Sequence, residues 1–102
     1  MIKKSIITLL SLLFIYTVYA EEVLIDGINY QVINNIHEAR VIPMPIGDKY
    51  SGNIHIPDSI LYNGVYYKVT SIGTNAFRES KDLLSVNIPY SVNIIEAWSF
   101  EG

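Results

Sequence analysis

The sequence predicts a mostly β protein, a short repeat solenoid preceded by a hairpin-rich N-terminal cap. Residues 72–77 (IGTNAF) return as residues 95–100 (IEAWSF), an internal echo 23 residues along the chain. Short runs of β-forming residues alternate with turn pairs such as Asp26-Gly27, and no long stretch has the 3.6-residue period of a helix. Repeats of this length cannot bury an apolar side alone, so they stack on their neighbours.

The first twenty residues have the three-part layout of a secretory signal peptide. Lys3 and Lys4 give a basic start, residues 5–15 form an apolar run, and Val18-Tyr19-Ala20 places small residues before a cut. The apolar run is shorter than the roughly 20 residues that a membrane-spanning helix needs. We therefore expect cleavage after Ala20, a secreted or cell-surface location, and no membrane segment in the mature chain.

The mature chain, residues 21–102, would be acidic and free of cysteine. Without Lys3 and Lys4 it has five basic and ten acidic residues, a formal net charge of −5. The basic residues are scattered, which argues against nucleic acid as a partner, because phosphate binding needs a patch of lysine and arginine. No disulfide can form without cysteine, so stability depends on apolar stacking.

Two hairpins are expected in the cap, residues 21–68. Asp26-Gly27 and Asn63-Gly64 each lie between β-forming runs and supply the positive φ angles of a tight hairpin turn. Residues 39–42 and 53–56 are predicted strands between these two turns. We interpret the second hairpin as an insertion in the first, irregular coil of the solenoid.

The regular part is expected over residues 69–102 and contains about one and a half repeats. Residues 69–72 and 83–88 are predicted strands, and residues 92–95 begin another coil. Strand alternation directs every second residue from Leu84 onward into the interior. The predicted interior comprises Ile72, Phe77, Leu84, Val86, Ile88, Ile95 and Phe100. The two phenylalanines should occupy equivalent positions, one coil apart.

These segments resemble the BspA-type leucine-rich repeat. Residues 69–77 (VTSIGTNAF), 83–89 (LLSVNIP) and 91–92 match its pattern of a strand, a small turn, an Ala-Phe pair, a polar corner and a second strand ending in Ile-Pro. The resemblance covers about residues 53–102 and implies a right-handed leucine-rich-repeat solenoid. Residues 25–60 resemble the N-terminal cap that precedes such repeats. The family comprises secreted and cell-surface bacterial proteins, some of them adhesins that engage host proteins.

The chain also departs from the family pattern. The cysteine that usually follows the phenylalanine corner is absent, Glu96 stands where the first copy has Gly73, and Trp98-Ser99 replaces Asn75-Ala76. The repeats stop soon after Phe100, whereas solenoids generally need about three repeats and polar end caps. We therefore expect the front part of a longer protein or a shortened relative, with self-association through an uncapped C-terminal end.

No residues in the sequence have the spacing of a catalytic, metal or cofactor site. His37 and His55 are the two histidines, and neither belongs to a metal-ligand motif. The sequence has no Gly-x-Ser-x-Gly elbow and no phosphate-binding glycine loop, and its carboxylates are dispersed. The prediction is a non-catalytic protein without cofactors or metals. A small secreted hydrolase that uses His37 or His55 is the least favoured alternative.

Three of the six tyrosines in the mature chain, Tyr62, Tyr66 and Tyr67, cluster on the Asn-Gly hairpin. Tyrosine is common at interfaces because it combines a large contact area with a hydrogen-bonding group. One interpretation is a protruding patch for protein contact. The other, which we favour, is that these rings cover the open end of the solenoid.

The predicted function is a secreted or cell-surface module for protein–protein interaction or adhesion. Its partner would be an extracellular protein or a host or matrix surface. The alternative is a purely structural cap fragment of a longer or truncated repeat protein, with no ligand of its own. A repeat fold by itself does not specify a ligand, so the sequence leaves the choice open.

Overall fold

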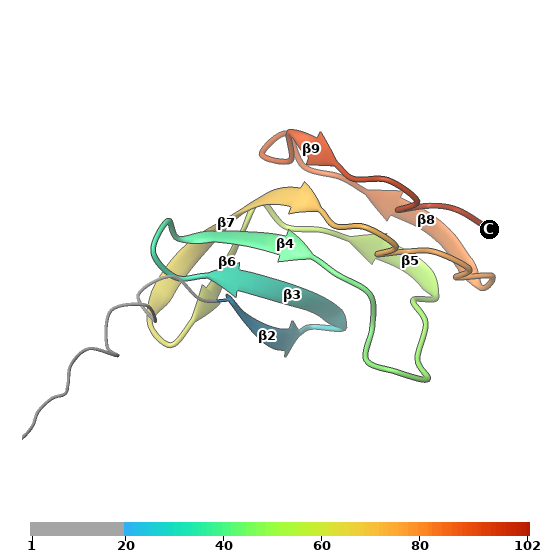
Figure 1. Cartoon of the computed structure of the whole chain (residues 1–102), viewed down its shortest axis with the longest axis horizontal. Helices are drawn as coiled ribbons and strands as arrows, with labels where there is room; N and C mark the ends of the chain where they lie inside the picture. The colour runs from blue at the N-terminus through green and yellow to red at the C-terminus, as the bar shows by residue number, and fades with distance from the viewer. Residues whose placement is uncertain (1–19) are drawn as a thin grey trace, which may run out of the picture.

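Eight β-strands and no helix make up residues 20–102, the part of the chain that the computed structural model describes (Figure 1). The strands are β2 (Ala20–Ile25), β3 (Ile28–Ile33), β4 (Glu38–Val41), β5 (Gly52–His55), β6 (Ser59–Tyr62), β7 (Val65–Ile72), β8 (Leu83–Asn87) and β9 (Ile94–Ile95). The prediction of a mostly β protein is confirmed. The predicted signal peptide, residues 1–20, lies outside the described residues except for Ala20. Within residues 20–102, no helix is long and apolar enough to span a membrane.

Both predicted hairpins are confirmed, and each turn depends on positive φ angles. β2 and β3 pair antiparallel through a turn in which Asp26 has φ 50° and Gly27 has φ 81°. β6 and β7 pair antiparallel through Asn63 (φ 51°) and Gly64 (φ 77°). Positive φ at both central residues is type I′ geometry, which asparagine, aspartate and glycine adopt more easily than other residues.

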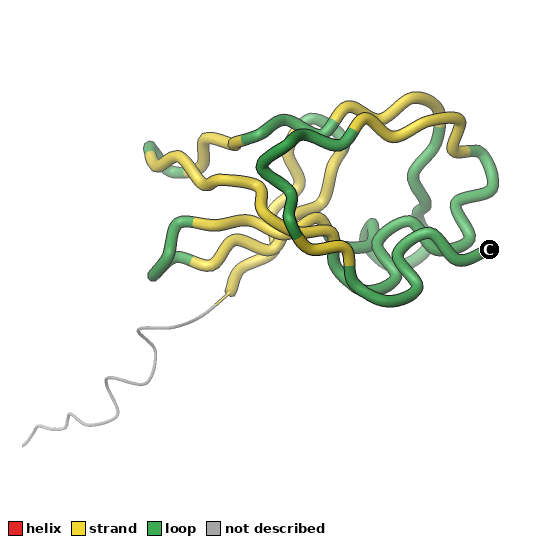
Figure 2. Tube along the Cα trace, turned by 90° about the horizontal axis from the view of Figure 1, so that it is seen from above, coloured by secondary structure: helices red, strands yellow, loops and turns green. Residues whose placement is uncertain are grey.

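Two sets of parallel strands stack the chain on itself. The larger sheet has the order β2-β3-β4-β7-β6, and β9 also pairs with β7. In this sheet β4, β7 and β9 run parallel and form what we call the long ladder. β5 and β8 run parallel in a separate sheet, the short ladder. Seen from above, the segments that connect the two ladders lie over one another around a shared interior (Figure 2).

Backbone hydrogen bonds join successive turns of the chain beyond the strands. The amide of Gly73 donates to the carbonyl of Val41 (2.7 Å), and the amide of Glu96 donates to the carbonyl of Ile72 (2.9 Å). Gly73 and Glu96 therefore occupy equivalent positions, as the 23-residue echo predicts. Close packing favours glycine at position 73, because a Cβ atom there would lie 2.9 Å from Cδ of Arg40.

β7 belongs both to the second hairpin and to the long ladder. Its first half pairs with β6, from Val65↔Tyr62 to Lys68↔Ser59, and its last residues pair with β9. The strand runs unbroken across the boundary that the sequence predicts between residues 68 and 69. The hairpin and the first repeat strand are therefore one continuous piece of backbone.

The prediction that Leu84 points into the interior is wrong, because β8 contains a bulge. Gly52 pairs with Leu83 while the next residue, Asn53, pairs with Ser85, so Leu84 is the extra residue. Leu84 is 77% exposed, and Leu83 packs against the core in its place. A bulge shifts the alternation of side chains by one residue, and the sequence carries no signal for it here.

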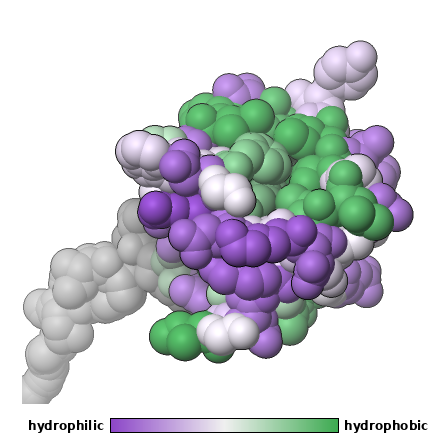
Figure 3. Space-filling model, turned by 90° about the vertical axis from the view of Figure 1, so that its right-hand side faces the viewer, coloured by the Kyte–Doolittle hydropathy of each residue, from purple (hydrophilic) through white to green (hydrophobic). Residues whose placement is uncertain are grey.

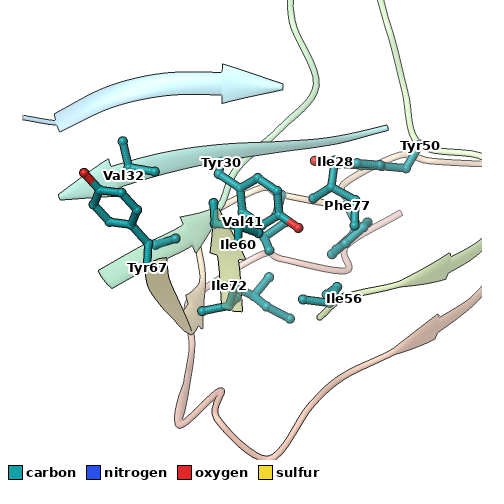
Figure 4. Packing of buried hydrophobic residues seen from close by; sticks show 13 residues of the cluster. Ile28, Tyr30, Val32, Val41, Tyr50, Ile56, Ile60, Tyr67, Ile72 and Phe77 are labelled. Atoms are coloured by element: carbon teal, nitrogen blue, oxygen red, sulfur yellow. The ribbon is translucent and has the colours of Figure 1, made fainter. Parts of the chain in front are cut away.

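The core lies against the larger sheet, with side chains from β3, β4, β6 and β7, and continues to the segments that cross to the short ladder (Figure 4). Its largest fully buried side chains are Tyr30, Ile56, Ile72, Val32, Val41 and Val69. Val86 packs against this core as predicted, whereas Ile88, Ile95 and Phe100 are exposed, contrary to the prediction. Ile95 lies on β9, which has a strand partner on one side only among the described residues.

Three aromatic rings form a column through successive turns. Phe77 stacks on Phe100 with ring centroids 5.1 Å apart and an interplanar angle of 11°. On its other side Phe77 packs against Tyr50, with centroids 4.6 Å apart. The predicted equivalence of Phe77 and Phe100 is thus confirmed. Tyr50, which lies in the segment between β4 and β5, extends the column on this side.

Candidate functional site

A groove of about 980 Å³ lies between the β6–β7 hairpin and the ends of β5 and β8. Its walls include two tyrosines, two histidines and two charged side chains: Tyr66, Tyr90, His37, His55, Asp58 and Lys68. All six residues are exposed. The groove is therefore an open surface where several chemically useful side chains meet.

Strand alternation explains which part of β7 faces the groove. Tyr66 and Lys68 are exposed, whereas the intervening Tyr67 and the following Val69 are buried. Successive side chains of a strand point to opposite faces, so one run of sequence supplies both groove and core. The register then adds neighbours, since Lys68 pairs with Glu38 on β4 and with Ser59 on β6.

The structure separates the three tyrosines that the sequence grouped together. Tyr66 is 68% exposed and lines the groove. Tyr67 is 7% exposed and packs edge-on against the ring of His37, with centroids 5.7 Å apart. The hydroxyl of Tyr62 donates to Oε2 of Glu21 (2.6 Å). Only Tyr66 presents most of its ring to solvent, and its contact with a protein stays a prediction.

Three polar side chains of the groove have no polar partner elsewhere in the described part of the chain. His55, Asp58 and Lys68 make no side-chain hydrogen bond or ion pair with another described residue. The Oγ atom of Ser91, which also lines the groove, is buried without a hydrogen-bond partner.

Sequence reasoning did not bring these residues together. His37 and His55 belong to no motif in the sequence. Both line the groove, and His37 lies beside β7 because the amide of Lys68 donates to its carbonyl (3.0 Å). Register is a long-range property, and no local pattern in this chain encodes it.

A second cavity, of about 370 Å³, adjoins the groove and shares His55 and Ser59 with it. Asp26 also lines this cavity, so the three residue types of a hydrolase triad are present. No hydrogen bond joins any two of these three side chains, so they are not arranged as a triad in this structure. Within residues 20–102, no group of three histidine, aspartate or glutamate side chains could hold a metal ion.

A scan against protein-family models and a search of curated proteins gave no match. Among solved structures, the chain is similar to a leucine-rich repeat protein from Bacteroides ovatus ATCC 8483, with a TM-score of 0.66 and 25% sequence identity. The match covers 76% of this chain and 20% of that protein, so the chain spans about a fifth of its length. The resemblance to bacterial leucine-rich repeat proteins that the sequence carries is therefore confirmed in the structure.

Proposed function

We propose that the chain is a secreted or cell-surface, non-catalytic module for protein–protein interaction or adhesion. In this proposal the two ladders are the first coils of a right-handed BspA-type solenoid that follows a hairpin-rich cap. The observation that carries it is the stacking of successive turns through two parallel ladders, together with the likeness to a leucine-rich repeat protein. Stacked repeats give extended surfaces that proteins commonly use for recognition.

Export is supported by the three-part layout of residues 1–20 in the sequence. Cleavage after Ala20 would leave Glu21–Ile25 of β2 paired with β3. Signal-peptide removal would therefore leave the first hairpin in place. Mass spectrometry of the exported protein tests this proposal, and a first residue other than Glu21 would contradict the proposed cut.

Tyr66 is the hairpin residue that we propose for contact with a protein partner. The Tyr66→Ala variant is expected to lose about 1–3 kcal/mol of binding free energy, because exposed tyrosines often anchor interfaces. The variant should unfold like the unchanged chain, since the side chain is mostly exposed. Binding is measured on an array of purified extracellular and matrix proteins, with the unfolding curve measured in parallel.

Tyr67→Ala is the matched control, because it truncates the adjacent ring in the core. It should reduce stability rather than affect binding selectively. Absence of any partner above background for the unchanged chain would count against the proposed function. Equal binding by the Tyr66→Ala variant and the unchanged chain would remove Tyr66 from the contact surface.

The second candidate is a structural cap, and the apolar β9 end of the molecule favours it. Ile94, Ile95, Trp98 and Phe100 are all exposed here, and the Arg78 guanidinium lies over the Trp98 ring at 5.8 Å. Seen from the right-hand side of Figure 1, hydrophobic residues gather in the upper part of the molecule, the level at which β9 lies, above a hydrophilic band (Figure 3). Such a surface would stack on another apolar layer, and a second copy of the chain supplies one.

Self-association through this end is expected to weaken strongly in the Ile95→Lys variant. A charge placed in an apolar contact must lose its hydration, so the apparent dimer dissociation constant should rise at least about tenfold. Sedimentation velocity over a range of protein concentrations measures this. Lys81→Ile, a change of opposite sense on the polar corner, is the comparison. A monomeric unchanged chain at every concentration would contradict self-association.

A further inference from the structure

We propose that the groove beside the β6–β7 hairpin binds a carbohydrate that carries a carboxylate, such as a uronic acid or a sialic acid. The inference rests on the proposed function only in treating the chain as a protein that recognises its ligand without transforming it. It is separate from the identity of any protein partner, because it is argued from the side chains of the groove.

The groove has two exposed aromatic side chains that come from different parts of the fold. Tyr66 lies on β7, and Tyr90 follows β8 and is fully exposed. Exposed rings that line a concave surface offer flat faces to the C–H groups of a sugar ring, and a tyrosine hydroxyl can bond to its oxygens. Isolated exposed aromatic residues need no explanation, but two that line one groove indicate a ligand.

The charge of the groove differs from that of the rest of the chain. Residues 21–102 carry ten acidic and five basic residues, yet the groove contains Lys68, His37 and His55 and a single carboxylate, Asp58. The ammonium group of Lys68 has no ion-pair partner within 4.0 Å among the described residues. An ammonium group without a partner at the wall of a groove favours an anionic group on the ligand.

The remaining polar groups favour a ligand that also has hydroxyl groups. Asp58 would repel a ligand that was only anionic, but its carboxylate accepts hydrogen bonds from sugar hydroxyls. The exposed Asn87, whose side-chain amide both donates and accepts hydrogen bonds, also lines the groove. The backbone of Lys68 is already paired on both sides, with Glu38 on β4 and Ser59 on β6. A peptide could therefore not add to the sheet as a new strand here, and a ligand would contact side chains.

Isothermal titration calorimetry at about 0.15 M ionic strength tests the proposal, because screening there suppresses weak long-range attraction. The ligands are tetragalacturonic acid with galactotetraose as its neutral counterpart, and 3′-sialyllactose with lactose. Hexaglutamate is the acidic peptide control. Binding of either acidic sugar, with weaker binding of its neutral counterpart and of hexaglutamate, is the expected result, and it also distinguishes uronic from sialic acids. Equal binding of the neutral sugar, preference for hexaglutamate, or no binding of either acidic sugar would overturn the proposal.

Two variants locate the binding in the groove. Lys68→Met is expected to weaken binding about tenfold by removing a charge-assisted hydrogen bond, and Tyr66→Ala about fivefold by removing a stacking ring. Lys81→Met and Trp98→Ala are matched controls, because these exposed side chains do not line the groove. Both side chains changed in the groove are exposed, so the variants are expected to fold. Controls that weaken binding as much as the groove variants would contradict the assignment.

The failure of this proposal is distinguishable from the failure of the proposed protein-binding function. If the chain captures a protein on the array while neither acidic sugar binds in calorimetry, the carbohydrate proposal fails while the interaction module stands. If the acidic sugar binds with the expected losses in both variants while no protein is captured, the carbohydrate proposal stands alone.

Discussion

Replacing Phe77 with alanine is expected to lower the free energy of unfolding by about 3–5 kcal/mol, the cost typical of a buried phenylalanine. Phe77 is almost fully buried and is the central ring of the column, between Tyr50 and Phe100. Its removal leaves a cavity in the interior that both ladders share, and it breaks two ring contacts at once. The free energy of unfolding of a small domain is only about 5–15 kcal/mol, so this substitution would remove a large part of it.

Urea unfolding followed by far-UV circular dichroism measures the effect, with Phe100→Ala as the control. Phe100 is 47% exposed and contacts one ring of the column, so its truncation should cost roughly 1–2 kcal/mol, well below the buried case. If Phe77→Ala does not fold at all, Phe77→Leu keeps the comparison quantitative, because it leaves a smaller cavity. Equal losses for the two alanine variants would contradict the stacked column.

Replacing Tyr50 with phenylalanine is expected to cost about 1–3 kcal/mol, although it removes a single oxygen atom. The Tyr50 hydroxyl donates to the carbonyl of Ile42 (2.7 Å) and accepts from the amide of Asn29 (3.0 Å). These bonds tie the segment after β4 to β3, and the Asn29 residue is itself buried. Without the hydroxyl, its two backbone partners lose their hydrogen bond in a place that water reaches poorly.

The same hydroxyl makes stability sensitive to high pH. Burial raises the pKa of Tyr50 to about 12 from its ordinary value of 10.0, although its hydrogen bond with Asn29 lowers it somewhat. Burial also raises the pKa of Tyr30, with smaller contributions from Tyr50 and Asp26. Below pH 10 these tyrosines are neutral in both states, so their contribution to stability is fully present. As pH rises from 10 through 12, the unfolded chain releases protons that the folded chain keeps, and stability falls.

Urea unfolding measured between pH 9 and pH 12 tests both parts of this prediction. Relative to its own value at pH 9, the Tyr50→Phe variant should lose less stability than the unchanged chain across this range. Tyr66→Phe serves as the control, because it removes an exposed hydroxyl and should leave the alkaline profile unchanged. An unchanged alkaline profile in Tyr50→Phe would show that Tyr50 is not protected from ionisation in the folded chain.

Local chemistry predicted the hairpins and the position of most strands correctly. The Asp-Gly and Asn-Gly pairs fix turns through backbone preferences that act within two residues. The 23-residue echo predicted the stacking of Phe77 on Phe100, because equivalent positions of stacked repeats share one interior. The bulge at Leu84 could not be predicted, since it depends on how Gly52 pairs across the short ladder. Tyr50 was missed because its spacing from Phe77 differs from the repeat length.

The candidate site was harder to predict from the sequence than the fold was. Three tyrosines on one hairpin suggested a patch, but strand alternation buries Tyr67 and leaves Tyr66 at the groove. The other groove residues come from the turn before β4, from β5 and from the segments after β5 and β8, and only the three-dimensional register brings them together. A groove formed by long-range pairing leaves no short motif, because its residues come from segments that are far apart in the sequence.

The first half of β7 belongs to the hairpin and its second half to the long ladder. The two regions are therefore expected to open together. A pull or a thermal fluctuation that frees residues 65–68 also loosens the strand on which β4 and β9 depend. The cap would then exchange its amide protons in the same opening event as the first repeat, as a single cooperative unit. A recombination point within β7 would divide this cooperative unit. Exchange of such modules during evolution would therefore have to move the hairpin and the first repeat together.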